Sequence, residues 1–246
     1  MKKIFAVVLA LTLALGVGAF AVAEGALSYA DYVAAAIEDE VTIEACVQAH
    51  QAWWEDNGQG LVTIYAADED GAYFLYNVPM SQEDAEKLVP GTRFVATGYK
   101  SEWSGEVEIA DVSSFEIIDG DAYIAEPVDV TDLLGTDALA EKINQKVAFK
   151  GMTVEPSTIE GDDAEYAFLY NWDGSGEEGA NSDLYFNVSK DGQTYTFTVE
   201  SYLTGEGIEV YEAVKALNVG DVVDLEGFLY WYNGANPHIT AVSAAE

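Results

Sequence analysis

Large aromatic side chains are the residues of this sequence best suited to bind a ligand. They recur in both halves of the chain, on predicted strands and in the loops between them. Aromatic faces stack on bases or on the apolar faces of sugars, while nearby carboxylates and amides hydrogen-bond hydroxyl groups. The alternative is that the rings fill the ends of a β-rich core. The candidate ligand-binding residues are Trp53, Trp54, Tyr65, Tyr73, Tyr76, Trp103, Trp172, Tyr185, Tyr195, Trp231 and Tyr232.

Residues suited to catalysis are sparse in comparison. The sequence has no Gly-x-Ser-x-Gly, His-Glu-x-x-His or phosphate-loop motif. The histidines, His50 and His238, have no nucleophile beside them in the sequence. Among 44 Asp and Glu residues, any chosen pair of carboxylates carries little information about acid–base catalysis. We therefore predict a protein that is not an enzyme, with no catalytic residues and no cofactor.

The residues that bind metals are also poorly represented. A single cysteine, Cys46, excludes a cysteine-based zinc site and an intrachain disulfide. Acidic runs such as Asp68-Glu69-Asp70 occur in predicted loops, but none completes the ligand pattern of an EF-hand. We expect these runs to be solvated turns and predict no metal site, with weak calcium binding as the alternative.

The charge of the chain is strongly negative. Ten Lys and Arg residues stand against the 44 acidic ones, giving a formal net charge of −34 over 246 residues. Nucleic-acid binding depends on cations that neutralise phosphates, so we expect no nucleic-acid partner. The same argument disfavours anionic membrane surfaces. With 50% hydrophobic residues, the chain can bury a sizeable core in one large or two modest domains.

The first residues have the pattern of a secretory signal peptide. Lys2 and Lys3 precede the apolar run 4–20, and Ala21-Val22-Ala23 supplies small residues where a signal peptidase cleaves. We predict cleavage after Ala23 and a secreted or cell-surface bacterial protein without stable membrane insertion. The alternative is a retained anchor, because about 20 apolar residues can span a bilayer.

The remaining sequence contains an internal repeat. Offsets between matching residues grow along the chain, so the second copy carries insertions, which loops tolerate. Between the copies lies an acidic segment with Pro127. We predict domains at 24–118 and 131–246, joined by a linker at 119–130. The clearest correspondence is that Gly91, Gly98 and Gly105 recur, with the same spacing, as Gly220, Gly227 and Gly234.

Each copy has the same predicted order of elements. Helical spacing of apolar residues marks 29–38, and alternation marks the half-buried strand 41–47. Further strands are predicted at 61–67, 72–78, 93–100 and 107–117, with a short helix at 81–88. The segment from Trp53 to Gly58 is predicted to be a loop. In the second copy we expect strands at 147–154, 183–188, 194–199, 222–232 and 238–244, with a helix at 210–217.

This order resembles the OB-fold, a five-stranded Greek-key barrel with a helix between its third and fourth strands. The segment 90–99, with Gly91 and Gly98, is similar to the fourth strand of many OB domains, and 219–228 is its counterpart. The chain also resembles tandem OB proteins that gut Firmicutes secrete, most of them uncharacterised. The predicted fold class is therefore mainly β, with two tandem five-stranded OB-like barrels and short helices.

The resemblance implies a function in recognition, because OB domains bind ligands through strands two and three and the flanking loops. Combined with the charge, this predicts a secreted, non-enzymatic protein that binds an uncharged or cationic extracellular ligand through aromatic-lined clefts. A glycan, a peptide or a surface protein would fit. The alternative is an acidic interaction or scaffold protein without a small-molecule cleft, and a nucleic-acid-binding OB protein is a third reading.

Overall fold

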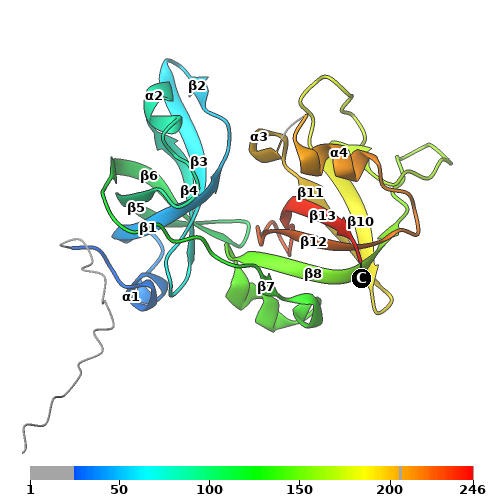
Figure 1. The fold of residues 1–246 in the computed structure, drawn as a ribbon, viewed down its shortest axis with the longest axis horizontal. Coiled ribbons are helices and arrows are strands. Elements are labelled where there is room, and N and C mark those ends of the chain that lie inside the picture. Colours follow the sequence, from blue (N-terminus) through cyan, green and yellow to red (C-terminus); the bar gives the residue numbers. More distant parts are fainter. Residues whose placement is uncertain (1–24, 205–206, 246) are drawn as a thin grey trace, which may run out of the picture.

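The chain folds into two β-barrels that lie side by side (Figure 1). The computed structural model describes residues 25–204 and 207–245. The predicted signal peptide, 1–23, lies outside the described residues. The predicted class, mainly β with two tandem OB-like barrels, is confirmed by the strand order of both sheets.

The first barrel is built from five long strands. They pair in the order β1-β5-β6-β4-β3, and β1 also pairs with β3, which closes the sheet on itself. The parallel pairing of β4 with β6 is the contact between the third and fifth strands of the Greek key. The elements are α1 (Tyr29–Ala34), β1 (Glu40–His50), β2 (Trp54–Asp56), β3 (Gln59–Ala67), β4 (Ala72–Pro79), α2 (Gln82–Ala85), β5 (Arg93–Trp103) and β6 (Glu106–Ile117).

The second barrel repeats this topology. Its strands pair in the order β8-β12-β13-β11-β10, β8 also pairs with β10, and β11 runs parallel to β13. Short edge strands extend the sheet. The elements are β7 (Val128–Asp129), two 3₁₀ turns (Thr131–Leu133 and Asp137–Lys142), β8 (Lys146–Glu155), β9 (Leu169–Tyr170), β10 (Leu184–Lys190), β11 (Gln193–Val199), α3 (Ser201–Thr204), α4 (Glu209–Lys215), β12 (Val222–Phe228) and β13 (His238–Ala244).

The repeated glycines serve the curvature of the barrels. A Cβ atom on Gly98 would lie 2.8 Å from the Ala110 carbonyl oxygen, and one on Gly227 would overlap the His238 carbonyl. Both glycines sit where the fourth strand changes register against the fifth. Absence of a side chain lets the backbones approach at that bend. The repeated glycines therefore meet the same steric requirement, close approach of two backbones, in each barrel.

Several predicted boundaries differ from the structure. Trp53 to Gly58 is not a plain loop, because β2 pairs with the start of β3 as a hairpin. The helix expected over 29–38 ends at Ala34, where Ala35 takes an extended backbone. The expected strand 222–232 ends at Phe228. Residues 229–232 instead turn towards the first barrel, which a pattern of apolar residues alone does not reveal.

The barrels have separate cores but share an aromatic junction. Tyr65 of β3 and Phe228 of β12 stack with ring centroids 4.3 Å apart and an interplanar angle of 11°. The Tyr65 hydroxyl is hydrogen-bonded to His238 Nδ1 at 2.9 Å. Phe74 contacts Tyr65 from its own barrel and Tyr230 from the other. Rings from both barrels are therefore interleaved, which fixes one barrel against the other.

Hydrogen bonds surround these rings. At the tip of the β5–β6 hairpin, the Asn233 backbone N–H donates to the Ser104 carbonyl at 2.7 Å. The Asn144 side-chain amide donates to the Val107 carbonyl at 2.8 Å. On another side, the Ala52 backbone N–H donates to the Tyr202 carbonyl at 2.7 Å. The junction is thus held at several points around its aromatic centre.

The segment between the barrels is also attached to the first one. The Gln48 side chain, buried on β1, donates to the Tyr123 carbonyl at 3.0 Å and accepts from the Ala125 backbone N–H at 2.8 Å. Val128 and Asp129 then pair with β8 as strand β7. The predicted linker is therefore fixed to both barrels along its length. Among the described residues, none of the helices has the length and apolar character needed to cross a membrane.

Phe228→Ala tests the junction. Phe228 is 3% exposed and stacked on Tyr65, so its truncation should lower the free energy of unfolding by about 3–4 kcal/mol. Chemical denaturation measures this change. Trp172→Ala is the matched control, because Trp172 is 74% exposed and its loss should change stability by less than about 0.5 kcal/mol. Equal effects of the two substitutions would contradict the assigned role of the junction.

Candidate functional site

Several of the predicted ligand-binding aromatic residues are packed inside the structure. Tyr65 lies in the barrel junction and Tyr73 in the core of the first barrel, both with 0% exposure. Trp53 donates its indole N–H to the Met80 carbonyl at 3.1 Å and packs against the same core. Tyr195 and Trp231 pack against the core of the second barrel. These rings stabilise the fold, as the alternative in the sequence analysis anticipated.

The exposed members of the set lie partly at separate places and partly near the barrel junction. Trp54 lies on the edge strand β2, and Trp172 lies in the loop after β9. Tyr76 and Tyr232 are exposed on different barrels, near Tyr230. Two further members were predicted to line the same clefts: Trp103 is exposed at the β5–β6 turn, and Tyr185 is half-buried on β10. None of the predicted rings lines the pocket described next.

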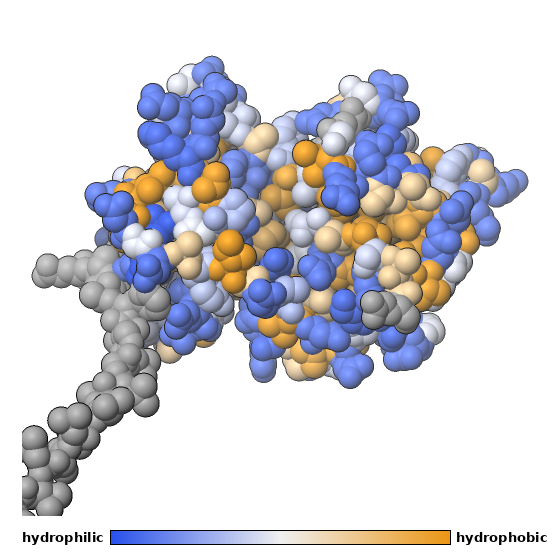
Figure 2. All heavy atoms as spheres, in the orientation of Figure 1, coloured by the Kyte–Doolittle hydropathy of each residue, from blue (hydrophilic) through white to orange (hydrophobic). Residues whose placement is uncertain are grey.

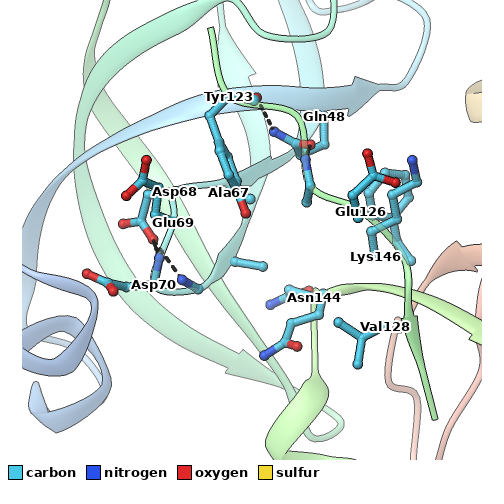
Figure 3. A pocket seen from close by; sticks show the side chains of 15 residues that line it. Gln48, Ala67, Asp68, Glu69, Asp70, Tyr123, Glu126, Val128, Asn144 and Lys146 are labelled. Atoms are coloured by element: carbon cyan, nitrogen blue, oxygen red, sulfur yellow. Dashed lines mark hydrogen bonds between the residues drawn. The ribbon is translucent and has the colours of Figure 1, made fainter. Parts of the chain in front are cut away.

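A pocket lies instead between the barrels. It has a volume of about 160 Å³, close to that of an interior cavity that holds a benzene-sized molecule. Figure 3 shows the turn 68–70 on one side, Glu126 and Lys146 on the opposite side, Tyr123 and Gln48 above, and Asn144 below. Ala67, Ala72, Val128 and Phe228 supply apolar surface. Both barrels and the connecting segment contribute walls, so the pocket exists only when the barrels are docked.

The β3–β4 turn builds the acidic wall. Asp68 Oδ1 accepts hydrogen bonds from the backbone N–H groups of Asp70 and Gly71, at 2.8 and 2.7 Å. Its Oδ2 accepts from the Tyr73 hydroxyl at 2.7 Å. Burial, followed by the nearby Asp68 carboxylate, raises the pKa of Tyr73. Asp68 therefore fixes the turn, while the side chains of Glu69 and Asp70 remain exposed.

The connecting segment builds the second wall. Because Gln48 binds the backbone of 123 and 125, the Tyr123 side chain is held over the pocket. Burial raises the pKa of Tyr123, and the Asp68 and Glu69 carboxylates raise it further. The Asp68 and Glu69 carboxylates therefore lie close to the Tyr123 ring. Negative charge beside an aromatic ring is an arrangement that suits an organic cation.

Charge in the pocket is predominantly negative. Asp68, Glu69, Asp70 and Glu126 line it together with a single cation, Lys146. Over the part of the chain that the structure describes, no ion pair neutralises Glu69, Asp70 or Glu126. Figure 2 shows hydrophilic residues over much of the visible face, with apolar residues in patches between them. The pocket thus combines free carboxylates with a partly apolar floor.

The described histidines, cysteine and carboxylates do not form a metal centre. Within 25–204 and 207–245, no group of three His, Cys, Asp or Glu residues is placed to hold a metal ion. His238 is buried, and this burial lowers its pKa to about 3, so its ring is neutral at ordinary pH. His50 Nδ1 is 2.8 Å from the Gln51 carbonyl oxygen. Cys46 is buried, and burial raises the pKa of its thiol.

Comparison with known proteins yields similarity in structure but none in sequence. No protein-family model matches the chain, and no curated protein matches it. A solved p204 HINb domain covers 86% of this chain and 99% of its own, with 10% identity and a TM-score of 0.37. An Ifi202 HINa domain in complex with 20-bp dsDNA covers 85% and 100%, with 10% identity and a TM-score of 0.36. A replication protein A heterotrimer bound to ssDNA covers 85% and 49%, with 11% identity and a TM-score of 0.32.

These findings correct two expectations from the sequence. We expected a secreted binder of glycans, peptides or surface proteins with aromatic-lined clefts, or else an acidic scaffold, and no nucleic-acid partner. Three of the similar solved structures are instead described as bound to dsDNA, and none of the predicted rings lines the pocket between the barrels. We therefore correct both expectations: recognition through aromatic-lined clefts or as an acidic scaffold, and the absence of a nucleic-acid partner. At such identities the likeness concerns the fold.

Sequence reasoning missed most of the pocket. The run 68–70 was expected to be a solvated turn, with weak calcium binding as the alternative, and Gln48, Glu126 and Lys146 were not singled out. The signal that could have located the acidic wall is Asp68 followed by Gly71 between two strands, which is typical of a tight turn fixed by its aspartate. The opposite wall depends on how the barrels dock, so the local sequence contains no equivalent signal.

Asp68→Ala tests the acidic wall. It removes the acceptor of three hydrogen bonds, one of them from a buried tyrosine, so the free energy of unfolding should fall by about 2 kcal/mol. Asp68→Asn keeps one oxygen for the two amides and should cost less than about 1 kcal/mol. Denaturant titration distinguishes the two. Equal and negligible losses would show that Asp68 does not fix the turn.

Proposed function

We propose that this chain is a non-enzymatic binding protein whose site is the pocket between the barrels and whose ligand is a small primary amine with an apolar body. The observation that supports this proposal is that the carboxylates of Glu69 and Asp70, which form no ion pair, share the pocket with the Tyr123 ring and with apolar surface. An ammonium group would pair with the carboxylates, while its carbon chain would cover the apolar surface.

Pocket size and composition set the class of amine. A volume of about 160 Å³ accommodates a molecule of roughly benzene size, such as a chain of five carbons. Tyr123 offers a ring face to the cation. Lys146, Asn144 and Gln145 lie on the far wall and would meet the other end of the ligand. Lys146 disfavours a second ammonium group there, so a monoamine or an ω-amino acid fits better than a diamine.

Support for a non-enzymatic role comes from the side chains around the pocket. Its carboxylates have no neighbouring histidine or cysteine among the pocket-lining residues, so an acid–base or nucleophile–base pair of that kind is not assembled. Binding by charge and apolar contact is the chemistry that these side chains offer.

Titration with matched ligands tests the proposal. Pentylamine and 5-aminopentanoate should bind the purified chain saturably at low salt, and 1-pentanol, which lacks the charge, should not. Binding is followed by calorimetry and by amide chemical shifts, and it should weaken as salt screens the ion pair. Absence of saturable binding by either amine would refute the proposal. Short duplex DNA is titrated separately, because some of the similar solved structures are described as bound to dsDNA.

Variants locate the site. Glu69→Gln and Asp70→Asn should each weaken amine binding by about fivefold, as expected for loss of one partly exposed ion pair. Glu83→Gln, an exposed carboxylate on α2, is the control and should leave affinity unchanged. If amines bind but both pocket variants behave like the control, the ligand class stands and the site is wrong.

We also propose that the chain is exported through its first 23 residues, on the basis of the sequence pattern alone. Expression in a bacterium should give a mature protein that begins at Glu24, as measured by intact mass. Ala21→Asp combined with Ala23→Asp should block the cleavage. Recovery of the unmodified chain with residues 1–23 still attached would contradict this proposal.

A further inference from the structure

Glu106 occupies an unusual position for a carboxylate. It opens β6 directly after the Ser104-Gly105 turn, and its side chain is completely buried where the two barrels meet. Its Oε2 accepts a hydrogen bond from the Trp231 backbone N–H of the second barrel, at 2.7 Å. Its Oε1 is buried without a close hydrogen bond, and the Asn144 side chain lies near enough to the carboxyl group to oppose the rise in its pKa. This carboxyl group thus links the two barrels at their junction.

No cation compensates this group among the described residues. The titratable groups that face it are Glu108 on its own strand, Tyr32 of α1, Tyr65 of β3 and Tyr230 of the second barrel, with the neutral Asn144 amide beside it. Each of these is acidic or neutral. A bare carboxylate here would lose its hydration without gaining a counter-charge, at a cost of several kcal/mol.

Lys100 is a buried lysine of the neighbouring strand β5, but its ammonium group is used elsewhere. It donates to the carbonyl oxygens of Tyr32, Val33 and Ala35 at the end of α1, at 2.9, 2.9 and 2.8 Å. Its role is to cap that helix. The environment of Glu106 therefore favours its uncharged, protonated form.

We propose that the barrel junction is closed by a protonated Glu106 carboxyl and that alkaline pH opens the junction by removing this proton. The inference stands apart from the proposed ligand, since it rests on Glu106 and its contacts. Opening is confined to the junction because each barrel has its own core, with separate sets of buried residues. Water can then reach the carboxylate while both barrels remain folded.

The direction of the pH effect follows from burial. Burial raises the pKa of Glu106 from 4.5 to about 8. Between these values the closed state holds a proton that the opened or unfolded chain releases. The stabilisation of the closed junction by the Glu106 proton is therefore fully present below pH 4.5 and is lost as pH rises towards 8. Within this window, each pH unit should raise the equilibrium constant for opening by up to about tenfold.

The buried carboxyl group of Glu200 should also make the stability of the protein fall as the pH rises. Glu200 follows β11, faces Asp183, Tyr65, Tyr185 and Gln51, and has a buried Oε2 without a partner. Burial is the main cause that raises its pKa to about 7. Because its titration overlaps that of Glu106, a variant is needed to separate the two contributions.

Glu106→Gln provides that separation, since glutamine keeps an acceptor for the Trp231 N–H and cannot ionise. Glu116→Gln, an exposed residue of the same strand, is the control. We expect small-angle scattering to show a larger radius of gyration for the wild type and the control at pH 9.5 than at pH 6. Glu106→Gln should keep its pH 6 dimensions. Far-ultraviolet circular dichroism should remain that of folded barrels at both pH values.

Urea unfolding from pH 5 to 9 supplies a second readout. The unfolding constant of the wild type should rise more steeply with pH than that of Glu106→Gln, by up to about tenfold per unit between pH 5 and 8. An unchanged wild-type radius across the range would overturn the proposal. So would identical pH dependence in the wild type and Glu106→Gln. If Glu106→Gln does not fold, Glu200→Gln decides: a radius of gyration that still grows between pH 6 and pH 9.5 in this variant supports the role of Glu106, and a radius that stays constant overturns it.

Discussion

The stacking of Tyr65 on Phe228 is the contact on which the arrangement of this molecule depends. Each barrel closes on itself and buries its own apolar side chains, so neither barrel needs the other to form a core. Their relative position is set by a small cluster of rings, with the Tyr65–His238 hydrogen bond at its centre. Features shared by the two barrels, including the pocket and the buried Glu106, follow from this docking.

The connecting segment turns a tandem of barrels into one body. Gln48 fixes residues 123 and 125 against the first barrel, and β7 pairs with the second. A flexible acidic segment would leave the space between the barrels without a defined shape. Once fixed, the same residues place Tyr123 and Glu126 in the pocket wall. The segment therefore has a structural role and a role in the proposed site.

A large excess of acidic residues shapes both the pocket and the junction. With 44 acidic residues and ten Lys and Arg residues, most carboxylates cannot find a cation. At the surface they remain hydrated, as at Glu69 and Asp70, and are free to pair with a ligand. In the interior a carboxyl group without a cation can instead hold a proton, as we infer for Glu106. The same shortage of cations therefore leaves carboxylates charged at the surface and favours a protonated carboxyl group in the interior.

The sequence by itself determined the architecture of each barrel. Alternating apolar residues define the strands, and the glycine pairs Gly98 and Gly227 mark the same bend in both copies, because these are local steric requirements. The identity of the site was decided only by the tertiary structure. A tyrosine has the same local pattern whether it is buried, like Tyr73, or exposed, like Tyr76. Gln48, Glu126 and Lys146 become neighbours only when two barrels dock, and that docking depends on contacts between residues far apart in the chain.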